Sequence, residues 1–439
     1  MNPIPPIKAA PSCADDADPT SLTVAQAISH ILDTIVPISD RQRLFLREAL
    51  GRVIAEEIIS PLNVPGHTNS AMDGYALAGS ELPGAAPREY RVAGTAYAGT
   101  PYDGGCASGE CVRIMTGAPM PSGTDTVVMQ EHARVVGEQH VQLSPGQKQG
   151  QNVRQAGEDI PKGGMVLDRG RQLTAADLGI LSSLGIAEVS VYRRPRVAFF
   201  STGDELRSIG ESLGKGDVYD SNRYSLYGML KRLDLEILDL GVVRDTPEAL
   251  KEAFASAEAT ADLVITSGGV SVGEADYVKA TLEELGRTRF WKIAMKPGRP
   301  LAYGSLGKAL FFGLPGNPVA VMVTFMQFVE PAIRYLASGR PWSPLVIRAK
   351  ALTPMRKRPG RFEFQRGILS LSPDGNLSVS DTGKQGSGIL TSMSRANCFI
   401  LLDEKNSGVA EGDLVDVQPF EPFMMGKEGP MAEGQGPRS

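Results

Sequence analysis

The feature that most constrains the fold of this chain is the alternation of apolar runs and helical patterns between residues 195 and 340. Each apolar run is short and bounded by polar residues, as expected of a buried strand. The runs are Val197–Phe200, Leu235–Leu240, Leu263–Thr266 and Leu310–Phe312, and the helical patterns are Asn222–Leu233, Pro247–Ala257, Asp276–Leu285 and Pro318–Leu336. This alternation predicts an α/β domain with a parallel or mixed sheet and helices on both of its faces.

Polar loops follow the four predicted strands. They are Ser201–Glu205, Arg244–Pro247, Ser267–Asp276 and Gly313–Pro318, and each carries glycine, an acid or a helix-capping residue. Ligands of such sheets bind beyond the carboxyl ends of the strands. Because the four loops converge on one rim, together they indicate a site more strongly than any one of them.

The third loop, Ser267–Gly273, is rich in glycine and serine. Such a backbone can approach an anion closely and turn its N–H groups toward it. Glu274 and Asp276 follow at a helix start, which suits a phosphate-plus-metal site. The loop lacks the sequence motifs of a P-loop and of a dinucleotide fingerprint, so a surface turn is the alternative interpretation.

Acidic residues of three rim loops should lie close together. Glu205, Asp245 and Asp276 would repel one another in one crevice, so a cation is expected among them, and Mg²⁺ is the natural candidate. For Asp245 alone, the favoured interpretation is that it caps the helix beginning at Thr246 or Pro247. Asp245 could serve in both roles.

A cationic stretch follows the acidic loops. Lys292, Lys296 and Arg299 suit a phosphate or an oxyanion, although a solvated charged loop is an equally good interpretation. In the next loop, Asn317 occupies an N-cap position and Pro318 the first helical position, so free N–H groups should face the crevice.

The rest of the chain divides into further segments by composition. Thr23-x-x-Gln26 predicts a capped helix, and further helices are expected over Asp40–Leu50 and Thr174–Leu184. The predicted segments are a disordered extension (1–19), a discontinuous helical domain (20–61 plus 158–194), an inserted β-rich domain (62–157), the α/β domain (195–340), a small C-terminal β-barrel or sandwich (341–422) and a flexible tail (423–439).

Composition excludes several classes of function. The net charge of −5 argues against general nucleic-acid binding. The longest apolar run, Val319–Phe328, is too short to span a bilayer, and the N-terminus lacks the apolar core of a signal peptide. We therefore expect a cytoplasmic protein without membrane or nucleic-acid partners. The four cysteines and four histidines show no metal-ligand spacing, and no nucleophile triad is evident.

Eight stretches, taken in order, resemble the MoeA family of molybdopterin molybdenumtransferases, which also forms the C-terminal domain of gephyrin. The stretches are NSAMDGYA at Asn69–Ala76, IMTGAPMPSGTDTVVMQE at Ile114–Glu131, NVRQAGEDI at Asn152–Ile160, STGDEL at Ser201–Leu206, DSNR at Asp220–Arg223, SGGVSVGEADYVK at Ser267–Lys279, KIAMKPGRPLAYG at Lys292–Gly304 and LPGNPVAV at Leu314–Val321. Each is weak alone, and the combination is highly specific. One departure is His67-Thr68, where the family usually has Phe-Asp.

The resemblance implies an elongated homodimer of four-part subunits, with the active cleft between subunits and a barrel at the C-terminus. It implies the last step of molybdenum cofactor synthesis: molybdate and adenylylated molybdopterin bind with Mg²⁺, the phosphoanhydride is hydrolysed, AMP leaves, and molybdenum enters the dithiolene. The adenylyltransferase and molybdoenzyme chaperones are candidate protein partners.

Site residues follow from the matched motifs. The implied catalytic residues are Asp73, Thr116, Glu205, Asp245 and Asp276, of which Glu205, Asp245 and Asp276 would hold the metal. The implied substrate-binding residues are Arg154, Ser267, Gly268, Gly269, Ser271, Gly273, Lys292, Lys296, Pro315, Asn317, Arg366 and Ser387. For Asp73, the residues alone favour an ordinary Asp-Gly turn, and only the resemblance assigns it a role.

Two other kinds of function remain as alternatives. A molybdopterin adenylyltransferase or a CinA-like nucleotide hydrolase would use the same α/β domain, but the β-rich insert and the barrel argue against a stand-alone adenylyltransferase. A gephyrin-like scaffold would need a fused domain and a long linker, and neither is seen in this sequence.

Overall fold

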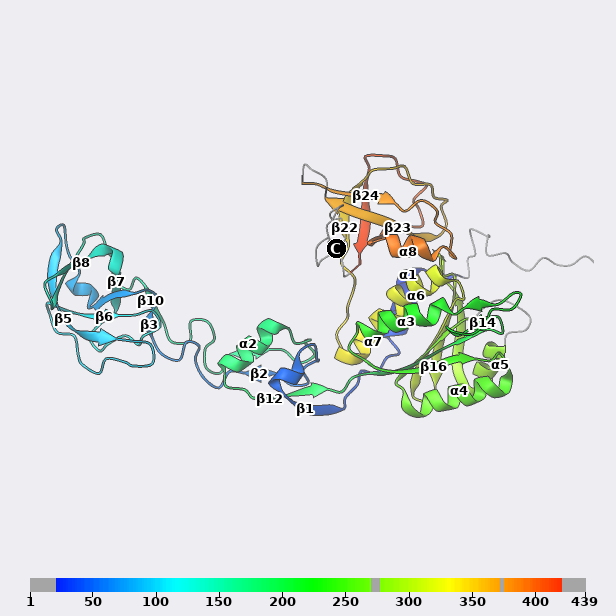
Figure 1. The fold of residues 1–439 in the computed structure, drawn as a ribbon, viewed down its shortest axis with the longest axis horizontal. Coiled ribbons are helices and arrows are strands. Elements are labelled where there is room, and N and C mark those ends of the chain that lie inside the picture. The colour runs from blue at the N-terminus through cyan, green and yellow to red at the C-terminus, as the bar shows by residue number, and fades with distance from the viewer. Residues whose placement is uncertain (1–20, 270–276, 372–374, 421–439) are drawn as a thin grey trace, which may run out of the picture. The chain divides into compact units, whose positions relative to one another are not determined.

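The computed structural model describes residues 21–269, 277–371 and 375–420 (Figure 1). The predicted extension 1–19, the tail 423–439, and the candidate residues Ser271, Gly273 and Asp276 lie outside the described residues. The chain forms two compact units. The smaller unit is Arg41–Val191, and the larger unit contains the described residues up to Asp40 and from Tyr192 onward.

A six-stranded sheet forms the centre of the larger unit, in the order β16-β13-β17-β21-β20-β18. The four predicted strands are confirmed as β13 (Arg196–Thr202), β16 (Glu236–Val243), β17 (Leu263–Ser267) and β21 (Ala309–Leu314), and they are mutually parallel. The sheet is mixed, because β18 (Gly286–Lys292) and β20 (Pro300–Leu306) add an antiparallel pair that the sequence did not predict.

Helices cover both faces of this sheet, as predicted. Along β13, Val197 and Phe199 pack with α1 (Val24–Leu32), α3 (Ser221–Lys231), and the helices that follow β21. Alternate residues Ala198 and Phe200 pack on the other face, with α4 (Pro247–Thr260) and α5 (Tyr277–Leu285). The capping box predicted at Thr23 and Gln26 is present at the start of α1.

The helix after β21 runs from α6 (Pro318–Thr324) through a π-helical turn (Phe325–Val329) into α7 (Glu330–Ser338). In the described part of the chain it is the one helix long and apolar enough to cross a bilayer. However, 72% of its apolar window is buried within the protein, as in the core helix of a globular domain.

A five-stranded barrel completes the larger unit, as predicted. Its strands follow the order β23-β24-β22-β26-β25, and β25 pairs back onto β23 to close it. They are β22 (Ile347–Ala351), β23 (Phe362–Leu371), β24 (Leu377–Asp381), β25 (Cys398–Leu402) and β26 (Leu414–Pro419), with a short helix, α8 (Leu390–Arg395), that was not predicted. The strand β19 (Met295–Lys296) from the α/β domain pairs with β23 and joins the two parts.

The smaller unit contains the predicted β-rich region as a six-stranded sheet in the order β7-β4-β6-β5-β9-β8. The strands are β4 (Gly74–Leu77), β5 (Arg88–Ala96), β6 (Glu110–Ile114), β7 (Thr126–Met129), β8 (Ala133–Val136) and β9 (His140–Leu143). Two-stranded ladders pair β1 (Arg41–Phe45) with β12 (Glu188–Tyr192), β2 (Ile58–Ile59) with β11 (Met165–Leu167), and β3 (Asn69–Ser70) with β10 (Val153–Arg154). In the larger unit, β14 (Leu206–Arg207) pairs with β15 (Val218–Tyr219).

Two expectations about helices need correction. The helix predicted over Asp40–Leu50 is wrong: β1 and a 3₁₀ turn (Leu46–Ala49) occupy this segment, and burial along β1 alternates residue by residue as in a strand. The helix of Thr174–Leu184 is confirmed as α2 (Ala175–Ser183), capped by Thr174 and Asp177. It lies in a different unit from α1, although the sequence had suggested that the two belong together.

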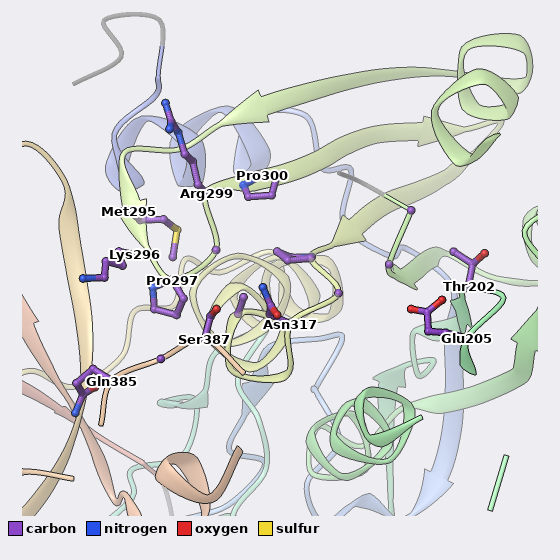
Figure 2. Close-up of a pocket in the computed structure, with 18 of the residues that line it drawn as sticks. Thr202, Glu205, Met295, Lys296, Pro297, Arg299, Pro300, Asn317, Gln385 and Ser387 are labelled. Carbon is purple, nitrogen blue, oxygen red and sulfur yellow. The ribbon is translucent and has the colours of Figure 1, made fainter. Parts of the chain in front are cut away.

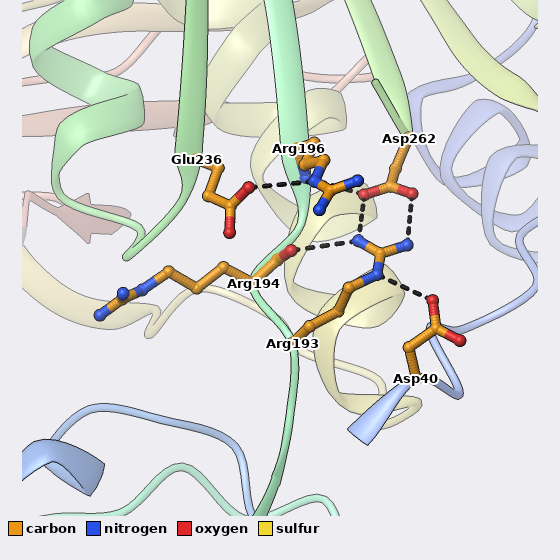
Figure 3. Close-up of polar contacts among 6 residues, drawn as sticks. All are labelled: Asp40, Arg193, Arg194, Arg196, Glu236 and Asp262. Carbon is orange, nitrogen blue, oxygen red and sulfur yellow. Dashed lines mark hydrogen bonds and ion pairs between the residues drawn. The ribbon is translucent and has the colours of Figure 1, made fainter. Parts of the chain in front are cut away.

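An arginine anchors the amino end of the central sheet. Arg193 donates from Nη1 and Nη2 to the carboxylate of Asp262, at 2.7 Å each, and from Nε to Asp40, at 2.9 Å (Figure 3). Asp262 precedes β17, and it also accepts the backbone N–H of Arg196 at 2.8 Å. Three chain segments are thereby joined at the end of the sheet opposite the rim loops.

Candidate active site

A cavity of about 780 Å³ opens at the carboxyl ends of the parallel strands (Figure 2). The loops after β13, β16, β17 and β21 line it, together with β19, the turn that follows β19, and loops of the barrel. Eight predicted site residues line this cavity: Glu205, Asp245, Gly268, Gly269, Lys296, Pro315, Asn317 and Ser387. The parallel register of β13, β17 and β21 is what brings these loops, distant in sequence, to one place.

The glycine cradle after β17 has a backbone conformation that residues with side chains rarely adopt. Gly268 has φ +94°, and a Cβ there would lie 2.4 Å from the carbonyl oxygen of Thr202. Gly269 has φ +65°, and its Cβ would lie 2.3 Å from Cγ2 of Val278. The neighbouring Ser267 is buried beneath the cradle and does not line the cavity. Of the predicted loop Ser267–Gly273, the described residues Gly268 and Gly269 therefore line the cavity and Ser267 does not.

Asp245 carries the most unusual group of the cavity. Its Oδ1 is buried and has no hydrogen-bond partner within the described structure. Burial raises the pKa of Asp245 above its ordinary value, and the negative charges of Asp204 and Glu205 raise it further. The favoured capping role is wrong, because Thr246 is the N-cap of α4 and its side chain accepts the N–H of Ala249. Among the described residues, Oδ1 of Asp245 thus has no hydrogen-bond partner, and the side chain of Thr202 only partly offsets the raised pKa of Asp245.

These carboxylates fit a divalent cation. A buried, unpartnered carboxylate oxygen beside further acids is a donor set that a hard ion such as Mg²⁺ prefers. Glu205 lines the same cavity, and Figure 2 shows its carboxylate near Thr202. Over the described ranges, no three His, Cys, Asp or Glu side chains are grouped closely enough to hold a metal by themselves. The predicted third acid, Asp276, is outside those ranges.

Cations on the opposite side of the cavity come from β19 and its turn. Nζ of Lys296 lies 3.3 Å from the buried carboxylate of Glu363, and the lysine side chain is half exposed. Arg299, which the sequence also indicated, lines the cavity with Arg361, which the sequence missed. Lys292 lies elsewhere: it lines a separate cavity that includes Trp291 and Tyr303.

Asn317 occupies the N-cap position of α6 and Pro318 follows it, as predicted. Its side chain makes no capping hydrogen bond, so the amide is available to the cavity that it lines. Figure 2 shows the Asn317 side chain beside Ser387 of the barrel. The carbonyl of Ser387 accepts the N–H of Val319 at 3.0 Å, which fastens the barrel loop to the first turn of α6.

Arg366 does not line the cavity, although the sequence assigned it to the substrate. It is almost fully buried, and burial lowers its pKa to about 10. It donates to Oγ of Ser392 and to the carbonyl of Gly386, both at 3.1 Å, while its backbone N–H donates to Oε1 of Gln385 at 2.8 Å. Arg366 thus holds the loop that places Gln385–Ser387 at the cavity. Sequence analysis did not predict Gln385 as a site residue, because no sequence pattern marks an uncharged loop residue.

Two predicted residues of the smaller unit are in direct contact. Thr116 donates to Oδ1 of Asp73 from its backbone N–H and from its hydroxyl, at 2.7 Å each. The backbone and hydroxyl bonds from Thr116 lower the pKa of Asp73 below its ordinary value. Arg154 lies on β10, opposite Asn69 of β3. The structure therefore brings together, within this unit, three motifs that are far apart in sequence.

The departure from the family pattern at His67-Thr68 lies in the same region. Oγ1 of Thr68 accepts the N–H of Ala156 at 3.4 Å and donates to Oε1 of Gln155 at 3.4 Å. The threonine hydroxyl therefore bridges to the segment that carries Arg154, although both bonds are long.

Comparison with known proteins identifies relatives along most of the chain. The family model described as MoeA N-terminal region (domain I and II) matches residues 22–185. A model described as a probable molybdopterin binding domain matches residues 198–335, and the MoeA C-terminal region (domain IV) matches residues 348–420.

Relatives match this chain over most of its length and over most of their own. A molybdopterin molybdenumtransferase from Haemophilus influenzae is 45% identical over 91% of this chain and 98% of its own length. Another from Nostoc is 36% identical over 90% of this chain and 93% of its own length. A crystal structure of a molybdopterin biosynthesis MoeA protein from Pyrococcus horikoshii, 28% identical, superposes with a TM-score of 0.80 and covers 91% of this chain and all of that one.

Proposed function

Because this chain belongs to the MoeA family, we propose that it is a molybdopterin molybdenumtransferase, which inserts molybdenum from molybdate into adenylylated molybdopterin and releases AMP. The observation that carries the proposal is that one cavity contains Asp245, whose Oδ1 has no hydrogen-bond partner among the described residues, together with a glycine cradle and Lys296. A cation at the acids and the positive charge of Lys296 suit a phosphoanhydride, which is strongly anionic.

The phosphate groups would lie against the backbone of the glycine cradle. Gly268 and Gly269 leave room for a phosphate to approach the main chain, and the amide of Asn317 can donate from the opposite loop. Lys296 and Arg299 would offset the charge of the phosphates or of molybdate. Gln385 and Ser387 add uncharged hydrogen-bonding groups that help to orient the substrate.

Asp245 and Glu205 would hold Mg²⁺, with Asp276 as the predicted third ligand. When bound, the ion supplies positive charge that stabilises the developing charge on the phosphate oxygens. Hydrolysis joins a water oxygen to the phosphorus of the anhydride and breaks the bridging P–O bond, which frees AMP and leaves a phosphate on the pterin. The side chains around the cavity position the substrate and exclude bulk water; we assign no general base.

Further features of the proposal come from the family resemblance. We propose a homodimer in the cytoplasm, in which Asp73, Thr116 and Arg154 act in the same reaction. The hydrogen bonds from Thr116 lower the pKa of Asp73 below a value at which the carboxylate is already ionised at neutral pH, which suits a role toward a cation or a polarised water. Sedimentation that shows only monomer at micromolar concentration would argue against the dimer.

The proposed activity is tested by supplying adenylylated molybdopterin, Mg²⁺ and molybdate and measuring AMP. We expect AMP release that depends on molybdate. Release that is unchanged when molybdate is omitted, or an absence of release with all three components, would contradict the proposal.

A further inference from the structure

The side-chain amide of Asn222 joins two of the loops that line the cavity. Asn222 is the second residue of α3, and only 9% of its surface is exposed. Its Nδ2 donates to Oγ of Ser267 at 2.9 Å and to the carbonyl oxygen of Gly316 at 2.7 Å. Since an amide nitrogen carries two hydrogens, both are used, and each goes to a different rim loop.

The two acceptors adjoin residues that line the cavity. Ser267 ends β17 and directly precedes the glycine cradle, while Gly316 stands between Pro315 and Asn317. The β17–β21 ladder ends with Ser267 opposite Leu314, followed by one bond of 3.1 Å from the N–H of Gly268 to the carbonyl of Leu314. Beside this last ladder bond, the amide of Asn222 adds a second link, from the side chain of Ser267 to the carbonyl of Gly316.

A role in starting α3 does not explain this residue. Asp220 is the N-cap, and its side chain accepts the N–H of Arg223 at 3.1 Å. Oδ1 of Asn222 is buried and accepts no hydrogen bond from the described residues. The contacts of Asn222 are therefore made by Nδ2. The orientation of the amide is set by the carbonyl of Gly316, which can only accept a hydrogen bond and so must face the nitrogen.

We propose that Asn222 is a positioning residue for the reaction, which holds the glycine cradle and the turn Pro315–Asn317 at the spacing that a phosphate-bearing substrate requires. This inference rests on the proposed function and adds a residue to which the family motifs gave no role. The bridge needs a group with two donors. A carboxylate of the same shape would place oxygen against the oxygen of Gly316 and push the two loops apart.

The test measures KM and kcat for AMP release with adenylylated molybdopterin as the varied substrate. Asn222→Ala should raise KM about tenfold, because loss of a buried hydrogen-bond bridge costs roughly one factor of ten in binding. Asn222→Asp should raise KM further, because it replaces the donors with acceptors. Ser267→Ala removes one acceptor and leaves the bond to Gly316, so its KM should rise less.

Asn397→Ala is the matched control. Its amide makes a comparable pair of bonds within the barrel: Nδ2 donates to the carbonyl of Leu369 at 2.8 Å, and Oδ1 accepts the N–H of Leu369 at 2.7 Å. Both alanine variants should melt at lower temperature than wild type. KM should rise for Asn222→Ala alone, since a merely structural bond would affect stability without changing KM.

The results for wild type and for the variants distinguish a failure of the proposed function from a failure of the positioning role of Asn222. Wild type that releases no AMP would overturn the proposed function and this inference with it. Active wild type together with an unchanged KM in Asn222→Ala and Asn222→Asp would overturn the positioning role alone. If both Asn222 variants fail to fold, Ser267→Ala decides: an unchanged KM there overturns the role, and a raised KM supports it.

Discussion

The guanidinium of Arg193 and the carboxylate of Asp262 form two parallel hydrogen bonds of 2.7 Å at the amino end of the central sheet. Both side chains are largely shielded from solvent, with exposed fractions of 20% and 22%. Burial raises the pKa of Asp262, but the bonds from Arg193 and from the N–H of Arg196 outweigh it, so the pKa lies below its ordinary value. The pair therefore stabilises the fold while Asp262 is ionised.

Arg193→Met should lower the free energy of unfolding at pH 7 by about 2 kcal/mol, because it leaves a partly buried carboxylate without its main partner. Since the pKa of Asp262 is depressed in the folded state, this stabilisation is present above the unfolded pKa and is lost as the pH falls through the folded pKa. The difference between the variant and wild type should therefore shrink below about pH 4. Urea unfolding at several pH values measures both effects.

Arg194→Met is the matched control, because Arg194 pairs with Asp234 at 2.8 Å in a more exposed position. Loss of the Arg194–Asp234 ion pair should lower the free energy of unfolding by less than about 1 kcal/mol, as for other exposed ion pairs. Equal losses of unfolding free energy in the two variants would contradict the stabilising role of the Arg193–Asp262 pair. A loss in Arg193→Met that does not change with pH would contradict it as well.

Gly268→Ala should disrupt the glycine cradle. The added Cβ would meet the carbonyl oxygen of Thr202 at 2.4 Å, and the backbone at φ +94° already disfavours any side chain. The strain costs on the order of 1–3 kcal/mol, so substrate binding should weaken at least tenfold as the loop moves to relieve it. Steady-state KM for adenylylated molybdopterin measures the change.

Gly228→Ala provides the comparison, since Gly228 lies in α3 with no atom near an added Cβ. Alanine there should leave KM unchanged and raise stability by up to about 1 kcal/mol, because it favours the helix. A normal KM for Gly268→Ala would show that the cradle is not part of the binding site.

Thr116→Val should weaken the reaction without disturbing the fold of the smaller unit. Valine keeps the shape and the backbone N–H bond to Asp73 but removes the hydroxyl bond. Loss of this one donor should lower kcat/KM for AMP release by roughly tenfold. Thr124→Val removes a hydroxyl bond to the carbonyl of Pro121 in the same unit and should have no such effect. Equal activities in both variants would remove Thr116 from the proposed site.

Sequence patterns predicted the parallel core of the α/β domain because its strands are continuous apolar runs. They missed β20 and also β18; charged residues such as Arg289 interrupt β18, which is an edge strand that pairs on one side only. They also mistook β1 for a helix, since Arg41, Arg43 and Phe45 are exposed and its burial alternates through half-buried neighbours. Local patterns carry less information where a strand buries little apolar surface.

For the site, sequence reasoning identified what depends on local geometry. Glycines at Gly268 and Gly269 and the N-cap Asn317 are where they were expected. What depends on tertiary packing was not predictable: that Thr246 caps α4 while Oδ1 of Asp245 has no partner among the described residues, and that Arg366 donates to Ser392 and Gly386 and does not line the cavity. Burial and partner choice are decided between segments distant in the chain, and a single sequence does not record them.

Asp245 is the residue that we propose to hold the cation on which phosphoanhydride hydrolysis depends. The most direct measurement is AMP release by Asp245→Asn as a function of Mg²⁺ concentration, beside wild type and Asp204→Asn, whose charge is nearby but which does not line the cavity. Asp245→Asn should lose about a hundredfold in rate or require far more Mg²⁺, as expected when a charged ligand becomes neutral, whereas Asp204→Asn should change little. A folded Asp245→Asn variant with the rate and Mg²⁺ requirement of wild type would contradict the claim.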